Sequence, residues 1–197
     1  MRHAAAVEQA ADQWLAAYPK SAKREQAWLL NLRATYRARR PLLRSVPSRF
    51  PAGSTSIGTY YIRTPQPNLL PWDAKAVEAK IAAYEKEFPN PRYAAEVRDL
   101  RSALAVSRGD WPEALKLCIA LLEDPTHPDL HSDAGLRLTN LFARLADPSL
   151  REEVLAAIQA SPKAKSFLGR YLDATEQSNE LYPLTFITAW LREQIGG

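Results

Sequence analysis

The segments FPNPRY (88–93), GDWPEAL (109–115) and DPTHP (124–128) divide residues 73–145 into four stretches, and in each stretch apolar residues recur every three or four positions. That spacing places the apolar residues on one face of a helix. Proline disfavours helix continuation because it lacks a backbone N–H, and glycine closes helices because it tolerates a left-handed backbone. The sequence therefore predicts four amphipathic helices joined by short turns, an order typical of stacked helical hairpins.

The ends of these four helices have recognisable capping residues. Asp73 and Asn90 are predicted N-caps of the first two helices, and Gly109 is predicted to close the second. Asp110 and Glu113 have the spacing of a capping box for the third helix, and the fourth begins at Pro128. The predicted buried residues are, in chain order, Val77, Ile81, Tyr84 and Phe88; Tyr93, Val97, Leu100 and Leu104; Ala114, Leu117, Cys118 and Leu121; and Leu130, Ala134, Leu138, Leu141 and Leu145.

Further helices are predicted on both sides of this block, over residues 4–18, 22–40, about 148–160, 162–172 and the segment after Pro183. In the first, Val7, Ala11, Trp14 and Tyr18 recur at helical spacing. In the second, Trp28, Leu32 and Tyr36 share one stripe, with Leu29 beside it, which is typical of a helix that faces a core.

Residues 41–71 lack helical periodicity and contain six of the fifteen prolines. Only residues 59–63 have a strand-like composition, and one strand that short does not form a sheet. We therefore predict an all-α fold with a long irregular, proline-rich connection. The expected organisation is a helical hairpin at 1–40, the connection at 41–71, helical repeats at 73–160 and capping helices at 161–197.

Composition and charge exclude some classes of protein. No apolar run reaches the roughly 20 residues that cross a bilayer, and the first residues do not resemble a signal peptide, so a cytoplasmic location is favoured, or a periplasmic one if the chain is a fragment.

The lone Cys118 is expected to be a small buried hydrophobe. The net charge is +4, yet residues 20–49 contain nine Lys or Arg residues and only one acidic residue, Glu25. Such an uneven distribution favours an anionic partner.

The segment GDWPEAL (109–115), followed by Cys118, Leu121 and Pro125, resembles the second half of a tetratricopeptide repeat. Pro91 and Pro128, which are 37 residues apart and each open a helix, fit a helical repeat. The pairs at 18–19 and 88–89, an aromatic residue before proline, are also similar to turns in bacterial outer-membrane assembly lipoproteins that contain such repeats. The resemblance implies an α-solenoid of antiparallel hairpins that binds a peptide or protein on its concave face, without catalysis.

Two groups of residues are candidates for partner binding. The resemblance implies contacts from the first helix of each hairpin, at positions expected to be exposed: Arg92, Glu96, Asp99, Arg137 and Asn140. Arg33, Arg37 and Arg40 fall on one face of the helix at 22–40, and Arg44 would join them only if that helix continued through Pro41. A row of guanidinium groups can bind phosphates or carboxylates, but it can also be a solvated face whose aliphatic stems cover apolar surface.

No pattern of catalytic or cofactor-binding residues is apparent. His127 and His131 are four residues apart with Asp129 and Asp133 nearby, a spacing that can hold a metal ion. Acidic residues in a first helical turn are also favoured by the helix dipole alone. The sequence lacks a glycine-rich phosphate loop, a histidine-paired nucleophile and a Cys/His metal motif, so we expect no cofactor and no enzyme activity.

The function expected from the sequence is therefore a protein-interaction module or scaffold with a protein or peptide partner. The alternative is an electrostatic adaptor that holds an acidic protein or a nucleic acid through residues 20–49. Nucleic acid is the less favoured anion, because no recognised nucleic-acid-binding motif is present. A third alternative is a purely structural fragment of a larger repeat protein. The sequence does not predict an oligomeric state.

Overall fold

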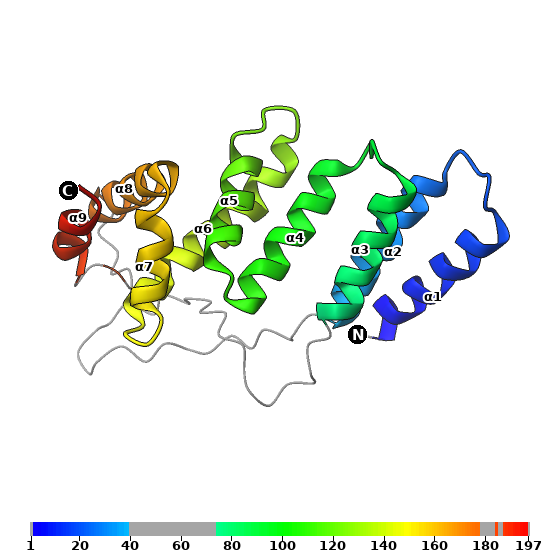
Figure 1. Ribbon diagram of the computed structural model, residues 1–197, viewed down its shortest axis with the longest axis horizontal. Helices are drawn as coiled ribbons and strands as arrows, with labels where there is room; N and C mark the ends of the chain where they lie inside the picture. Colours follow the sequence, from blue (N-terminus) through cyan, green and yellow to red (C-terminus); the bar gives the residue numbers. More distant parts are fainter. Residues whose placement is uncertain (1, 40–73, 178–183, 185–186, 197) are drawn as a thin grey trace. The chain divides into compact units, whose positions relative to one another are not determined.

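The computed structural model describes residues 2–39, 74–177, 184 and 187–196. Within these residues all the regular secondary structure is helical, which confirms the predicted all-α class (Figure 1). The predicted connection 41–71, its strand-like residues 59–63 and the predicted cap Asp73 lie outside the described residues. No helix in the described ranges is both long and apolar enough for a bilayer crossing.

The helices follow the predicted order. Their bounds are α1 Arg2–Ala17, α2 Arg24–Arg39, α3 Ala74–Glu87, α4 Ala94–Arg108, α5 Trp111–Leu122, α6 His131–Ala143, α7 Arg151–Gln159, α8 Pro162–Gln177 and α9 Thr188–Gly196, with short 3-10 turns η1 Pro128–Leu130 and η2 Arg144–Ala146. The second helix of the predicted repeat block begins at Ala94, three residues later than expected. The reason is that the Arg92 N–H, which an Asn90 cap would have bound, donates instead to the Glu25 carboxylate.

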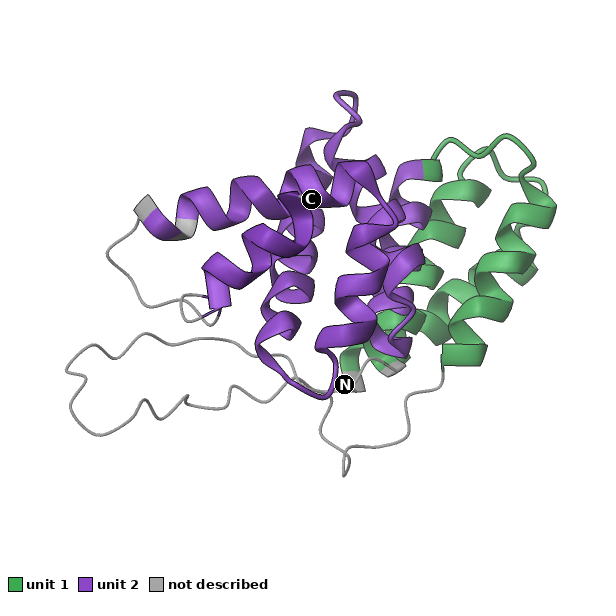
Figure 2. Cartoon of the chain, turned by 60° about the vertical axis from the view of Figure 1, so that its left-hand side comes forward, with its two compact units in different colours: residues 1–94 green, residues 95–197 purple. Residues whose placement is uncertain are grey.

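The chain forms two compact units, residues 1–94 and 95–197 (Figure 2). In the first unit, α3 packs on α2, which packs on α1. The helix predicted to open the repeat block thus belongs to the same unit as the N-terminal hairpin. Its predicted stripe is confirmed at Val77, Ile81 and Tyr84, all at most 1% exposed, whereas Phe88 is only partly buried.

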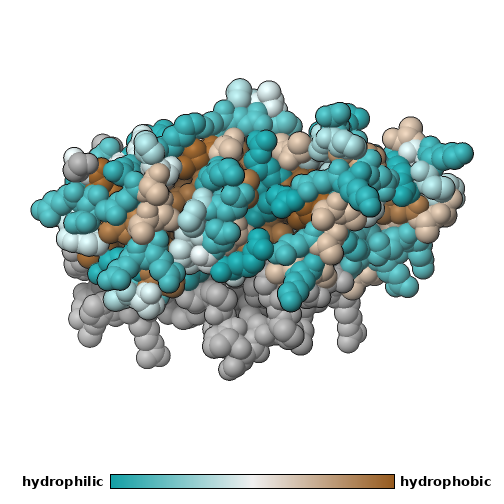
Figure 3. Space-filling view, viewed as in Figure 1, coloured by the Kyte–Doolittle hydropathy of each residue, from teal (hydrophilic) through white to brown (hydrophobic). Residues whose placement is uncertain are grey.

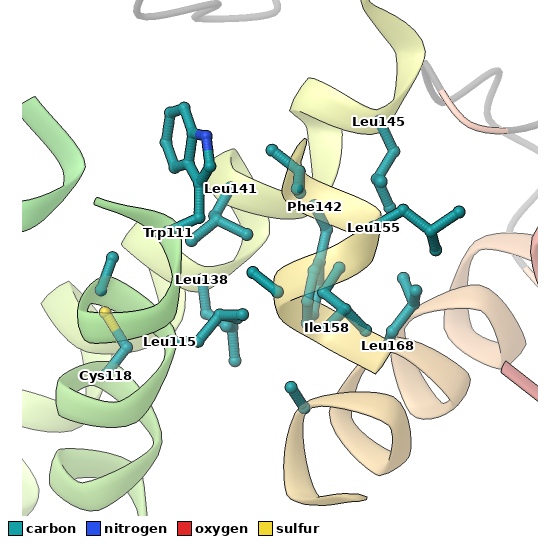
Figure 4. Close-up of a cluster of buried hydrophobic side chains, with 14 of the residues drawn as sticks. Trp111, Leu115, Cys118, Leu138, Leu141, Phe142, Leu145, Leu155, Ile158 and Leu168 are labelled. Atoms are coloured by element: carbon teal, nitrogen blue, oxygen red, sulfur yellow. The ribbon is translucent and has the colours of Figure 1, made fainter. Parts of the chain in front are cut away.

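The core of the second unit is formed by side chains from α5, α6, α7 and α8, which meet in Figure 4. The predicted stripe of the fourth helix of the block is confirmed, because the five residues predicted as buried, from Leu130 to Leu145, are all buried. The buried face predicted for α5 was too narrow. Leu117 is only partly buried, whereas Trp111, Leu115 and Ile119 are buried, because α5 packs against α6, α7 and α8 on several sides.

The turn between α4 and α5 confirms Gly109 and Asp110 as caps, but only one half of the predicted capping box forms, because the Asp110 N–H donates to Ala105 and not to the Glu113 carboxylate. Gly109 has a φ of +74°, and the N–H groups of Gly109 and Asp110 donate to the carbonyls of Val106 and Ala105 at 3.3 and 3.0 Å. This pair of bonds is the Schellman motif, which ends a helix with a left-handed residue. The Asp110 carboxylate then accepts from the Glu113 N–H at 3.3 Å and caps α5.

Two glycine substitutions should therefore change stability in opposite directions. Gly109→Ala is expected to lower the free energy of unfolding by about 1 kcal/mol, because a Cβ disfavours the left-handed backbone. The nearest atom to that Cβ would be Cζ2 of Trp111 at 3.4 Å, an ordinary contact, so the cost is backbone strain. Gly169→Ala, inside α8 with nothing within 4 Å of the new Cβ, should raise stability by about 0.5–1 kcal/mol. Urea unfolding of both variants checks this, and a change of the same sign in both would contradict it.

Candidate functional site

A polar cluster joins α1, α2 and α3 inside the first unit. The Lys80 ammonium donates to Glu8 Oε1 at 2.9 Å and to Asn31 Oδ1 at 2.6 Å. Asn31 Nδ2 donates to Asp12 Oδ1 at 2.7 Å, and the Thr35 hydroxyl donates to Glu8 Oε1 at 3.0 Å. Asn31 and Thr35 are fully buried and Glu8 is 9% exposed. The two carboxylates of α1, Glu8 and Asp12, therefore contact α2 and α3.

A second set of polar contacts ties α2 to α3 and to the turn that follows it. The Glu25 carboxylate accepts from the Tyr84 hydroxyl at 2.8 Å and from the Arg92 N–H at 2.5 Å. The Arg24 guanidinium pairs with Glu87, which also accepts from the Trp28 indole N–H at 3.1 Å. Residues 1–39 contain only three carboxylates, Glu8, Asp12 and Glu25. Each of them is thus bonded to a group on α2, on α3 or in the turn after α3.

Away from these polar contacts, α1 and α2 form an apolar groove of about 390 Å³. We call it the α1–α2 groove. From α1 it is lined by Val7, Ala10, Ala11 and Trp14. From α2 it is lined by Gln26, Ala27 and Leu30, and from the turn before α2 by Lys23. Lys23 is the one charged side chain in this lining.

The apolar stripe predicted on the first helix faces this groove and solvent. Val7 is 46% exposed and Tyr18 is 56% exposed, and the Trp14 and Tyr18 rings pack on each other with centroids 5.2 Å apart. From α2, Leu30 is 51% exposed. The space-filling view shows apolar side chains at the surface over α1 and α2 (Figure 3). Leu30 was not predicted as a binding residue, because it lies off the stripe of Trp28, Leu32 and Tyr36. An apolar residue outside the core-facing stripe was the signal that could have identified it.

The predicted row of arginines lies beside the groove. Arg33 and Arg37 are exposed on α2, and neither guanidinium pairs with a carboxylate of the residues described. At 3.6 residues per turn, Arg37 lies within about 20° of Leu30 around the helix axis, and Arg33 within about 60°. The row therefore continues the face that lines the groove. Arg40 and Arg44 lie outside the described residues.

The residues implied by the repeat resemblance are mostly not exposed. Arg92 is exposed, with its guanidinium 5.7 Å from the centre of the Tyr93 ring. The expectation of exposure was wrong for the other four, because they lie on helices that pack together within the second unit: Glu96, Asp99, Arg137 and Asn140 are all partly buried.

Asp99 and Arg137 bind each other across α4 and α6. Arg137 Nη1 lies 2.5 Å from Asp99 Oδ1 and 3.2 Å from the Ser102 hydroxyl. Both charged side chains are about 15% exposed. Cys118 of α5 is fully buried beside this group, and burial raises the pKa of its thiol, which confirms the prediction of a small buried residue. The Asp99–Arg137 pair thus links α4 and α6, with Cys118 of α5 beside it.

The two histidines of the turn before α6 both contact Asp124. His127 Nδ1 is 3.3 Å from Asp124 Oδ2, and His131 Nε2 is 2.7 Å from the Asp124 backbone carbonyl. Within the described residues, no group of three or more His, Cys, Asp or Glu side chains is arranged to hold a metal ion. In this turn the histidine nitrogens thus serve as hydrogen-bonding groups between α5 and α6.

The same turn predicts a stability change at acidic pH. Hydrogen bonds from the Thr126 hydroxyl and N–H, at 2.5 and 3.0 Å, lower the pKa of Asp124 to about 2. The unfolded value is near 3.9, so the carboxylate stabilises the fold above about pH 4, and this contribution disappears as pH falls through about 2. The difference in unfolding free energy between wild type and Asp124→Asn should therefore be larger at pH 5 than at pH 2.5 in urea titrations. An equal difference at both pH values would contradict this assignment.

The chain matches no protein-family model, no curated protein and no solved structure. The α1–α2 groove and its row of arginines are therefore interpreted from their own geometry and charge.

Proposed function

We propose that this protein is a non-catalytic interaction module that binds a partner protein or peptide on a surface of its helices. We further propose that its hairpins stack as a tetratricopeptide-like α-solenoid. The observation that supports binding is the exposed apolar side of α1. Val7 and Leu30 each leave about half of their surface in water, and a groove lies between them.

A contiguous, concave apolar surface indicates a binding site more strongly than a single exposed apolar residue does. Scattered single apolar residues on a surface need no explanation. Here Val7, Trp14 and Leu30 line one groove. A partner that covers them would remove apolar area from water, which is the main favourable term in most protein association.

The exposed Arg33 and Arg37 favour a second candidate, an electrostatic adaptor for an acidic protein or nucleic acid. The two candidates differ in their response to charge reversal. If the arginines alone hold the partner, Arg33→Glu combined with Arg37→Glu abolishes binding, and raised salt does the same. If apolar contact dominates, binding is weakened but survives both changes.

The proposal is tested by capture of partners from a lysate on the immobilised full chain, with and without nuclease, at low and raised salt. A captured protein is then purified and titrated against the free chain. Saturable binding of one protein that withstands nuclease and raised salt is the expected result. Capture that depends wholly on nucleic acid, or that disappears at modest salt, would overturn it in favour of the electrostatic adaptor.

A further inference from the structure

We propose that the α1–α2 groove seats one amphipathic helix of a partner protein, with an apolar stripe in the groove and acidic residues flanking that stripe. This inference rests on the proposed function, since it names the partner surface that the interaction module would bind. It follows from three features of the first unit: the length of the groove, the distribution of charge around it, and the fixed orientation of α1.

The length of the groove fits about two helical turns. Its lining extends from Val7 to Trp14 on α1, and from Lys23, just before α2, to Leu30 on α2. At 1.5 Å per residue each wall is about 10 Å long. A helix laid along it places residues at i, i+3 or i+4, and i+7 in the groove, the spacing used when an amphipathic helix occupies an apolar groove.

The charge around the groove has one sign. Lys23 lies in the lining, Lys20 is exposed in the turn beyond it, and Arg33 and Arg37 are exposed on the same face of α2 at the other end. The three carboxylates of residues 1–39 are bonded to groups of α2, α3 and the turn after α3, as described above. Basic groups thus flank both ends of an apolar groove, which favours acidic flanks on the occupant.

The polar cluster fixes which side of α1 is left uncovered. Rotation of α1 to bury Val7 and Trp14 against α2 and α3 would expose Glu8 and break its contacts with Lys80 and Thr35. Breaking such buried contacts is costly, because each leaves a polar group without its partner. The apolar side of α1 therefore remains available to another molecule.

Three matched peptides test the charge and shape of the occupant. Each has about 18 residues, roughly five helical turns, the same leucine stripe, and flanking residues that are all Glu, all Gln or all Lys. Binding of the fluorescein-labelled peptides to the full chain is measured by anisotropy. The Glu peptide is expected to bind roughly tenfold or more tightly than the Lys peptide, and this preference should shrink as salt is raised.

Three substitutions locate the binding site. Leu30→Asp and Val7→Asp should each weaken binding of the Glu peptide roughly tenfold or more, because a carboxylate would be desolvated in the groove. Leu136→Asp is the matched control. Leu136 is 49% exposed on α6, compared with 51% for Leu30, and its substitution should leave binding unchanged. Circular dichroism of each variant verifies that the helices remain folded.

The outcomes separate this inference from the proposed function. Failure of the Glu peptide to bind, or binding that Leu30→Asp and Val7→Asp leave intact, overturns the inference. Concentration-dependent dimerisation that Leu30→Asp abolishes would assign the groove to a second copy of this chain and overturn it as well. The interaction module itself is tested by the capture experiment described above, which uses no designed peptide, so it can stand when the peptide result fails.

Discussion

Leu141→Ala should lower the free energy of unfolding by about 3 kcal/mol. Leu141 is 1% exposed in the core where α5, α6, α7 and α8 meet. Removing a buried leucine side chain forfeits its transfer free energy and leaves a cavity, with costs of about 2–5 kcal/mol. Urea unfolding followed by circular dichroism gives the midpoint and the slope from which this change is obtained.

The control for this prediction is on the same helix. Leu136 is 49% exposed on α6, so Leu136→Ala should change the free energy of unfolding by about 0.5 kcal/mol or less. Equal losses from the two variants would mean that the described faces of α6 are assigned incorrectly.

Lys80→Met should lower stability by about 2 kcal/mol. The ammonium of Lys80 neutralises Glu8 and binds Asn31, and the substitution leaves a carboxylate that is 9% exposed next to an apolar side chain. Removal of one partner of a fully buried pair costs about 3–5 kcal/mol. We expect less, because the Lys80 side chain is 24% exposed and water screens part of the charge.

A second substitution distinguishes lost pairing from lost packing. Glu8→Gln removes the uncompensated charge, so the double variant with Lys80→Met should be more stable than Lys80→Met alone. Lys86→Met, on the exposed surface of the same helix, should have little effect. If Glu8→Gln gives no rescue in thermal or urea unfolding, the electrostatic explanation of the cluster is wrong.

Helices with strong local signals were predictable from the sequence. Gly109 and Asp110 determine the turn between α4 and α5 through their own backbone and side-chain preferences, and the structure agrees. All five residues predicted as buried between Leu130 and Leu145 are buried, because periodicity identifies residues that share a face, although the buried Phe142 was not predicted. The exact first residue of a helix was less predictable, as α4 shows. Its start depends on the Arg92 N–H, which donates to Glu25, 67 positions earlier in the sequence.

The candidate site was only partly predictable, because periodicity does not tell which face of a helix is covered. In α1 the residues that share an apolar face line an open groove, while Glu8 faces inward. The partner that stabilises Glu8 is Lys80, 72 residues away in sequence. Arg33 and Arg37 were recognised as one row, whereas Asp99 and Arg137, predicted as exposed contacts, pair with each other across 38 residues.

The most direct test of the account is the reactivity of a thiol placed in the α1–α2 groove. Leu30→Cys adds one exposed thiol to a chain whose only other cysteine, Cys118, is fully buried. We predict that one thiol is labelled rapidly in the free protein, and that the purified partner or the Glu peptide slows this labelling roughly in proportion to the fraction of protein bound. Slow labelling in the free protein, or labelling that a bound partner does not change, would contradict the assignment of this groove as the interaction surface.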